Sequence, residues 1–173
     1  DYFLNFSFYN ENGIIKRPSD ARYDVNLNSQ KYLFQSNVNA SLTSTTKVAL
    51  KMNTQLWYDN RPYEDISNLF YYSMRANPVR FPATLPAEEG DDFVRYGNNN
   101  SWDVGPIDLN PYALLSRGYA KRYYSWLTSV LTVDQDLKSI TKGLHAKVLA
   151  SFYNYTYSGD YRYFTPFYFK VDD

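Results

Sequence analysis

The side chains best suited to binding chemistry in this sequence are aromatic. Tyr (19), Phe (11) and Trp (3) make up 19% of the 173 residues. A group of them lies in or near one long segment without strand-like pattern, and its members are Trp57, Tyr58, Tyr63, Phe70, Tyr71, Tyr72, Tyr96 and Trp102. Aromatic faces stack on flat ligands such as sugar rings, but they also pack loops onto the structure beneath them. Loop packing is the simpler interpretation. The candidates for contact with a substrate or a partner protein are Trp57, Tyr58, Tyr63, Tyr71, Tyr72 and Trp102.

Residues for covalent or metal chemistry are few. The sequence has one histidine, His145, and no Cys, so transition-metal ligation has little support. An acidic cluster offers oxygen ligands for calcium, but its spacing matches no calcium-binding loop; it consists of Glu88, Glu89, Asp91 and Asp92, with Asp103 and Asp108 further along. No glycine-rich phosphate loop, Ser/His/Asp arrangement or placed carboxylate pair is present. We therefore expect no enzymatic activity, no catalytic residue, no cofactor and no metal site.

The elements that must position the aromatic residues are predicted to be strands. Polar and apolar residues alternate through residues 35–43, and this period gives a strand one apolar and one polar face. The pattern recurs at about 2–9, 31–43, 47–58, 119–135 and 144–155. A sixth strand at 161–171 is weaker, because Pro166 has no N–H for a sheet hydrogen bond.

The two faces of these strands differ in an informative way. The polar face carries mostly Asn, Gln, Ser and Thr with few charges, whereas the outer face of a soluble sheet is usually charged. The apolar face carries Val, Leu and Ala in mid-strand, with aromatic residues near the strand ends: Tyr32, Phe34, Tyr58, Tyr123, Tyr124, Phe152 and Tyr155. An aliphatic band between aromatic girdles is typical of a membrane-spanning β-barrel, whose other face lines a polar lumen.

The connections between the strands are alternately long and short, at about 10–30, 44–46, 59–118 and 136–143. Outer-membrane barrels alternate in this way, with long outer loops and short periplasmic turns. Within the longest connection, Ile66, Leu69, Phe70 and Met74 have helical spacing before Pro78, which predicts a helix over 66–75. The predicted fold is all-β, with antiparallel up-and-down strands forming part of a transmembrane β-barrel and one short helix in a long extracellular loop.

Overall composition narrows the alternatives. With 18 basic and 18 acidic residues the net charge is zero, so nucleic acid is not an expected partner. No apolar run reaches the about 18 residues of a spanning helix, although barrel strands need only about 9–11. A soluble, aromatic-rich carbohydrate-binding β-domain is the alternative interpretation, and a structural or adhesive β-domain is a weaker third. No signal peptide is present, so an exported chain would be a mature product or a fragment. The strand-like sequence that begins directly at Asp1 favours a fragment.

An ordered set of short segments resembles the SusC/RagA-like TonB-dependent transporters. The early hairpin is represented by YFL at 2–4 and YNENG at 9–13. The next hairpin is represented by residues 32–53, which include QSNV at 35–38 and LTSTTK at 42–47. The helical loop is represented by MRANP at 74–78 and FP at 81–82. A later hairpin is represented by NPYA at 110–113, DQDL at 134–137 and ITKGL at 140–144.

This resemblance implies a barrel segment of an importer of large nutrients in the bacterial outer membrane. Glycans or oligosaccharides are the favoured substrates, and peptides are second. The implied partners are a SusD-like surface lipoprotein, outer-membrane lipid and the TonB complex, the last through an N-terminal part that this chain lacks. The barrels of this family have about 22 strands. Residues 1–173 would then form a partial barrel of about five to six strands, without the plug.

Overall fold

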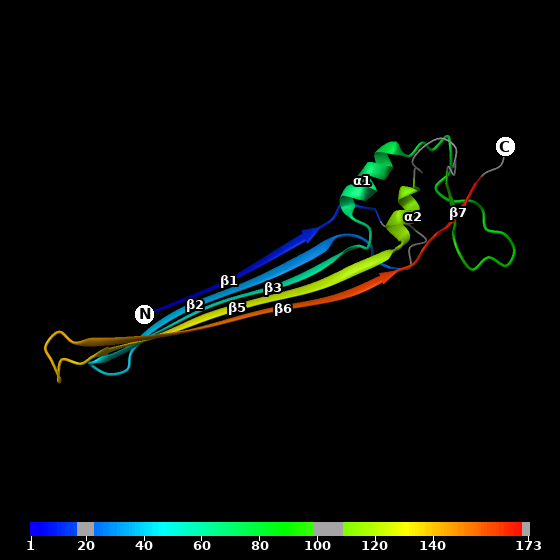
Figure 1. Cartoon of the computed structure of the whole chain (residues 1–173). Coiled ribbons are helices and arrows are strands. Elements are labelled where there is room, and N and C mark those ends of the chain that lie inside the picture. Colours follow the sequence, from blue (N-terminus) through cyan, green and yellow to red (C-terminus); the bar gives the residue numbers. More distant parts are fainter. Residues whose placement is uncertain (17–22, 99–108, 171–173) are drawn as a thin grey trace. The chain divides into compact units, whose positions relative to one another are not determined.

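The computed structural model describes residues 1–16, 23–98 and 109–170 (Figure 1). The described elements are, in chain order, β1 (Tyr2–Asn12), β2 (Asn28–Ser41), β3 (Thr46–Pro62), α1 (Ile66–Arg75), β4 (Arg95–Gly97), α2 (Pro111–Ser116), β5 (Gly118–Asp136), β6 (His145–Tyr163) and β7 (Phe167–Phe169). One sheet has five strands in the order β1-β2-β3-β5-β6, and a smaller sheet pairs β4 with β7. The fold is mostly antiparallel β-sheet with two short helices, so the all-β prediction is confirmed.

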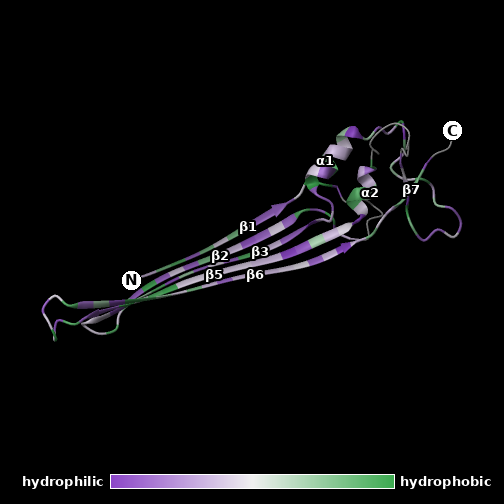
Figure 2. Cartoon of the chain, in the orientation of Figure 1, coloured by the Kyte–Doolittle hydropathy of each residue, from purple (hydrophilic) through white to green (hydrophobic). Residues whose placement is uncertain are grey.

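The five stronger strand predictions are each confirmed, and the strands are longer than predicted. They run from 11 residues in β1 to 19 in β5 and β6, whereas strands of globular proteins usually have about 3–10 residues. Hydrophilic and hydrophobic residues interleave along them (Figure 2). The alternation of connections is also confirmed, since residues 13–27 and 63–117 form long links while 42–45 and 137–144 form short ones.

Two details of the prediction are wrong. The sixth strand at 161–171 is not one element. Strand β6 continues to Tyr163, residues 164–166 around Pro166 are not in a strand, and the three-residue β7 follows. Strand β7 pairs with β4 in parallel, with Tyr96 opposite Tyr168. The long connection also holds a second helix, α2, which begins at Pro111.

The large sheet is open in the part of the chain that the structure describes. Strands β1 and β6 form its two edges and are not paired with each other. The closed barrel therefore stays a prediction. No described helix is long and apolar enough to cross a membrane.

The chain divides into two compact units. Unit 1 comprises Asp1–Glu11, Ser29–Asp59 and Arg122–Gly159, which are the sheet residues and the two short turns. Its described residues include no buried apolar side chain, and its buried residues are Ser29, Ser36 and Asp59. A single sheet without a covering layer has nothing within unit 1 against which to bury its apolar face.

Unit 2 comprises Asn12–Asn28, Asn60–Lys121 and Asp160–Asp173, and it holds all the buried apolar side chains of the described chain. They are Val25, Leu69, Phe81, Tyr96, Ala113, Leu114, Tyr119 and Ala120. Helices α1 and α2 pack against each other there. The long connections thus contain a conventional hydrophobic core, which is what orders a loop of this length.

Capping side chains fix where the two helices begin. The Asp65 carboxylate accepts a hydrogen bond of 2.8 Å from the backbone N–H of Ser67, and α1 starts at the next residue, Ile66. Asn110 caps α2, with its side-chain oxygen accepting from the N–H of Tyr112 at 3.0 Å, and Pro111 occupies the first helical turn. The predicted bounds of α1, 66–75, are confirmed.

Candidate functional site

One row of aromatic rings crosses four neighbouring strands on the predicted apolar face of unit 1. We call it the apolar-face row, and it consists of Phe8, Tyr32, Tyr58 and Tyr123 from β1, β2, β3 and β5. Successive ring centroids are 5.0, 6.2 and 4.9 Å apart. Cross-strand aromatic contacts of this kind stabilise neighbouring strands. The row has the arrangement of an aromatic girdle along one level of a sheet.

A second row lies on the opposite face, and we call it the polar-face row. Trp57 stacks on Tyr124 with centroids 4.8 Å apart and ring planes 25° apart. Trp126 continues the stack, with its ring 5.6 Å from Tyr124 and 6.4 Å from Trp57. On β6, Tyr157 lies 5.0 Å from Tyr124, and Tyr155 lies 5.5 Å from Trp126. Five rings from three strands therefore form one contiguous strip, in which neighbouring ring planes are tilted by up to 40°.

Polar groups from β2 hold Trp57 in place. Its indole Nε1–H donates a hydrogen bond of 2.7 Å to the Ser29 hydroxyl, and the Lys31 ammonium lies 4.5 Å from the indole ring centre. A cation over an aromatic face is attracted by the ring quadrupole. The strip thus places a positive charge beside aromatic surface, a combination suited to contact with a polar ligand such as a sugar.

Further along the same face, amide and hydroxyl side chains are grouped as predicted. A shallow depression of about 160 Å³ is lined by Gln35, Asn37, Asn53 and Thr128, together with Lys51, Met52 and Val130. These side chains come from β2, β3 and β5. The face that carries the polar-face row is therefore the hydrophilic one.

The face of two aromatic residues was predicted wrongly. Tyr124 and Tyr155 belong to the polar-face row, not to the apolar face. Successive residues of a strand point to opposite faces, so Tyr123 and Tyr124 cannot share one. The sequence contained the signal needed to assign them, because Leu127 and Leu131 give the apolar positions of β5 and Tyr123 is in phase with both.

The described candidate contact residues are divided between unit 1 and unit 2. Trp57 and Tyr58 are consecutive in β3 and lie on opposite faces of unit 1. In unit 2, Tyr63 stacks on Tyr163 with centroids 4.4 Å apart, and the Arg117 guanidinium lies 5.5 Å from its ring. Arg117 also pairs with Glu64 at 2.9 Å, so Tyr63 belongs to a packed structural cluster.

Two of the remaining candidates, Tyr71 and Tyr72, are on helix α1. This helix belongs to unit 2, where their rings contact each other at 5.2 Å and Tyr71 is 52% exposed. Phe70, on the same helix, is also exposed, whereas Tyr96 is buried in the unit 2 core. Trp102 lies outside the described residues. Of the predicted contacts, Trp57 has the surroundings best suited to a ligand.

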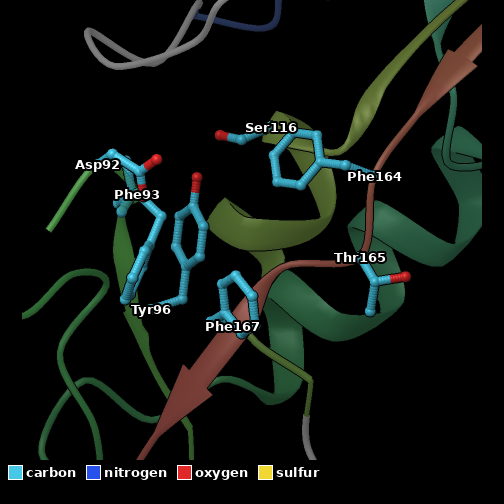
Figure 3. A pocket seen from close by; sticks show the side chains of 8 residues that line it. Asp92, Phe93, Tyr96, Ser116, Phe164, Thr165 and Phe167 are labelled. Carbon is cyan, nitrogen blue, oxygen red and sulfur yellow. The ribbon is translucent and has the colours of Figure 1, made fainter.

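Unit 2 contains a cavity that sequence reasoning missed (Figure 3). Its volume is about 290 Å³, and it is lined by Asp92, Phe93, Val94, Tyr96, Ser116, Phe164, Thr165 and Phe167. The parallel pairing of β4 with β7 joins two of its walls. No periodic pattern in the sequence connects these distant segments, and only the fold brings them together.

Part of the acidic cluster forms ion pairs with an arginine. Arg95 pairs with Glu88 and, at 2.7 Å, with Asp91. The hydrogen bond to Glu88 and the nearby Asp91 carboxylate raise the pKa of Arg95. The described residues include no group of three or more acidic, His or Cys side chains arranged to hold a metal ion, and Asp103 and Asp108 lie outside the described part.

No model of a known protein family, no curated protein and no solved structure matches this chain.

Proposed function

We propose that this chain is a segment of the wall of an outer-membrane β-barrel importer of the SusC/RagA-like TonB-dependent class. One observation carries the proposal. The five long strands of the large sheet alternate polar and apolar residues, yet unit 1 buries none of its apolar side chains. An exposed apolar sheet face of this extent marks a surface that lipid or further protein covers.

The exposed fractions of apolar side chains in unit 1 show how much apolar surface is uncovered. Phe6 is 66% exposed, Leu42 is 65%, and Val148 is 64%. Fully burying one such side chain is worth about 1.5–3 kcal/mol. Lipid on the apolar face would remove these side chains from water, and the apolar-face row would lie at one boundary of the lipid as a girdle.

The open edges support a place within a larger barrel. Each edge strand leaves a line of unpaired N–H and C=O groups, which is costly where water is excluded. Five strands are fewer than the about 8 of the smallest outer-membrane barrels. We therefore infer that further strands pair with β1 and β6.

The polar-face row supports a role in contacting substrate. Stacked rings beside the Lys31 ammonium suit glycans or oligosaccharides, with peptides as the second substrate class. The proposed function is directional import without covalent chemistry. A SusD-like lipoprotein outside the bacterial outer membrane and the TonB complex would be the partners, as the family resemblance implies.

The alternative of a soluble carbohydrate-binding β-domain has less support. Such a domain would bury the apolar rows beneath a second layer. Leu4, Phe6 and Phe8 of β1 are instead all more than half exposed, at 60%, 66% and 54%.

The proposal is tested by placing charge on each face in turn. Val38→Arg and Leu50→Arg put a cation on the apolar face, at a cost of about 2–4 kcal/mol at mid-membrane depth. Asn37→Arg and Asn53→Arg are the matched controls, because both residues lie in the depression on the opposite, polar face. In the full-length protein, we expect the first pair to reduce the folded protein recovered from outer membranes, measured by heat-modifiable electrophoretic mobility, and the second pair to assemble normally. Equal recovery of all four variants would count against a lipid-facing sheet.

A further inference from the structure

The unit 2 cavity has the features of a built binding site that the proposed function does not use. Its lining comes from three separate parts of unit 2: residues 92–96, the end of α2, and residues 164–167. At about 290 Å³, it is close to the lower end of the range for small-molecule sites. Figure 3 shows the rings of Phe93, Tyr96, Phe164 and Phe167 around one space, with Asp92 at its edge.

A buried hydroxyl without a partner points to a ligand. Ser116 is only 4% exposed and lines the cavity, and its Oγ has no hydrogen-bond partner among the described residues. Buried polar groups in native proteins are nearly always paired, so each exception requires a physical reason. A ligand with a hydroxyl or carbonyl oxygen in the cavity would supply the missing partner.

The walls favour a positive ligand. Four of the eight lining residues are aromatic, and the Phe93 and Phe167 rings lie 4.9 Å apart at a tilt of 52°. Ring faces carry the negative part of the aromatic quadrupole and attract cations. Asp92 is the one charged residue among the lining set, and it is negative. An anion would meet repulsion from the ring faces.

The lining also supplies oxygen atoms that can accept hydrogen bonds, from Asp92, Ser116 and Thr165. We propose that this cavity binds a small organic ammonium compound that carries a hydroxyl or carbonyl oxygen. The ammonium group lies against the rings beside Asp92, and the oxygen pairs with the Ser116 hydroxyl.

The test compares choline with 3,3-dimethylbutan-1-ol, a neutral compound of the same shape in which carbon replaces nitrogen. Binding to the whole chain in a polyoxyethylene detergent is measured by isothermal titration calorimetry. We expect saturable choline binding with an affinity at least about tenfold above that of the neutral compound. Absent choline binding, equal binding of both compounds, or preferential binding of glucose in a parallel titration would each overturn the proposal.

Three variants locate the site. Asp92→Asn and Phe167→Leu change exposed lining residues and should each weaken choline binding several-fold. Glu89→Gln removes an exposed carboxylate three positions away that does not line the cavity, and it should leave affinity unchanged.

Ser116→Ala distinguishes an effect on choline affinity from an effect on the stability of the fold. Because its hydroxyl has no partner in the described chain, the change should lower choline affinity without lowering the melting temperature. Loss of affinity in Glu89→Gln, or unchanged affinity in all the lining variants, would contradict the assignment.

Discussion

At the residue scale, the face of the strand on which a side chain lies matters more than its residue type. Trp57 and Tyr58 are neighbours of similar chemistry, yet Trp57 belongs to the polar-face row and Tyr58 to the apolar-face row. Under the proposed function, one ring would face the importer's interior and the other its lipid boundary. This pair therefore separates substrate contact from membrane anchoring at almost the same point of the chain.

We expect Trp57→Ala to reduce oligosaccharide uptake by roughly two- to tenfold, since stacking of aromatic rings is worth about 0.5–1.5 kcal/mol. Tyr58→Ala should leave the uptake rate per assembled protein unchanged and reduce only the amount assembled. The measurement is uptake of a labelled oligosaccharide, normalised to folded protein in the outer membrane. Equal effects of both substitutions on the normalised rate would contradict the assignment of the two faces.

Asn110 shows how one amide can organise a long connection. It is 1% exposed, and its side-chain N–H groups donate to the carbonyl oxygens of Ala83 and Gly97, both at 2.8 Å. Its oxygen caps α2 at the same time. An amide is the side chain that supplies both donors and an acceptor at this position.

Asn110→Asp should therefore destabilise unit 2 by more than about 2 kcal/mol, because two donors are lost and a charge is buried. The matched control is Asn77→Asp, an exposed residue whose side-chain oxygen accepts from the N–H of Val79 at 3.0 Å. We expect the control to be nearly neutral. Amide hydrogen exchange of Leu114, which is buried on α2, reports the difference, and equal exchange in the two variants would refute this role for Asn110.

At the element scale, helix α1 has a titratable cap. The backbone N–H and hydroxyl of Ser67 donate to the Asp65 carboxylate and hold the pKa of Asp65 below its ordinary value. A carboxylate with a lowered folded pKa stabilises at pH values above the unfolded pKa of about 3.9, and the contribution disappears as pH falls through the folded pKa. The cap should therefore be complete at neutral pH and lost in acid.

We expect α1 to fray as pH falls below about 4, seen as faster hydrogen exchange and changed NMR chemical shifts at Leu69. Asp65→Asn keeps an oxygen at the cap and should remove this pH response. The same acid transition in the Asn variant would show that another group controls the helix.

The sequence predicted the regular elements better than it predicted their contacts. Period-2 patterns located the five long strands, and helical spacing before Pro78 located α1. Helix α2 has only six residues, too few for a periodic signal. Strands β4 and β7 have three residues each and pair across a long stretch of chain, so no local pattern marks them. For the same reason, the cavity lined by residues of these segments could not be predicted.

At the scale of the whole molecule, the two units differ in how their apolar side chains are buried. Unit 2 has a hydrophobic core of its own, with Val25, Ala113 and Leu114 almost fully buried. Unit 1 has none among its described residues, and its apolar side chains are available to lipid or to further protein. The proposed barrel wall accounts for this difference, because lipid takes the place of a second protein layer.

Spin-label accessibility tests this claim most directly. The sequence has no Cys, so single cysteines can be labelled with nitroxides at apolar-face sites Val38, Leu131 and Val148 and at polar-face sites Asn37, Thr128 and Lys147. In lipid bilayers, we predict high accessibility to oxygen, which concentrates in lipid, at the first three sites. We predict higher accessibility to an aqueous nickel complex at the other three. Similar values on both faces, or water contact along the Val38 face, would contradict the account.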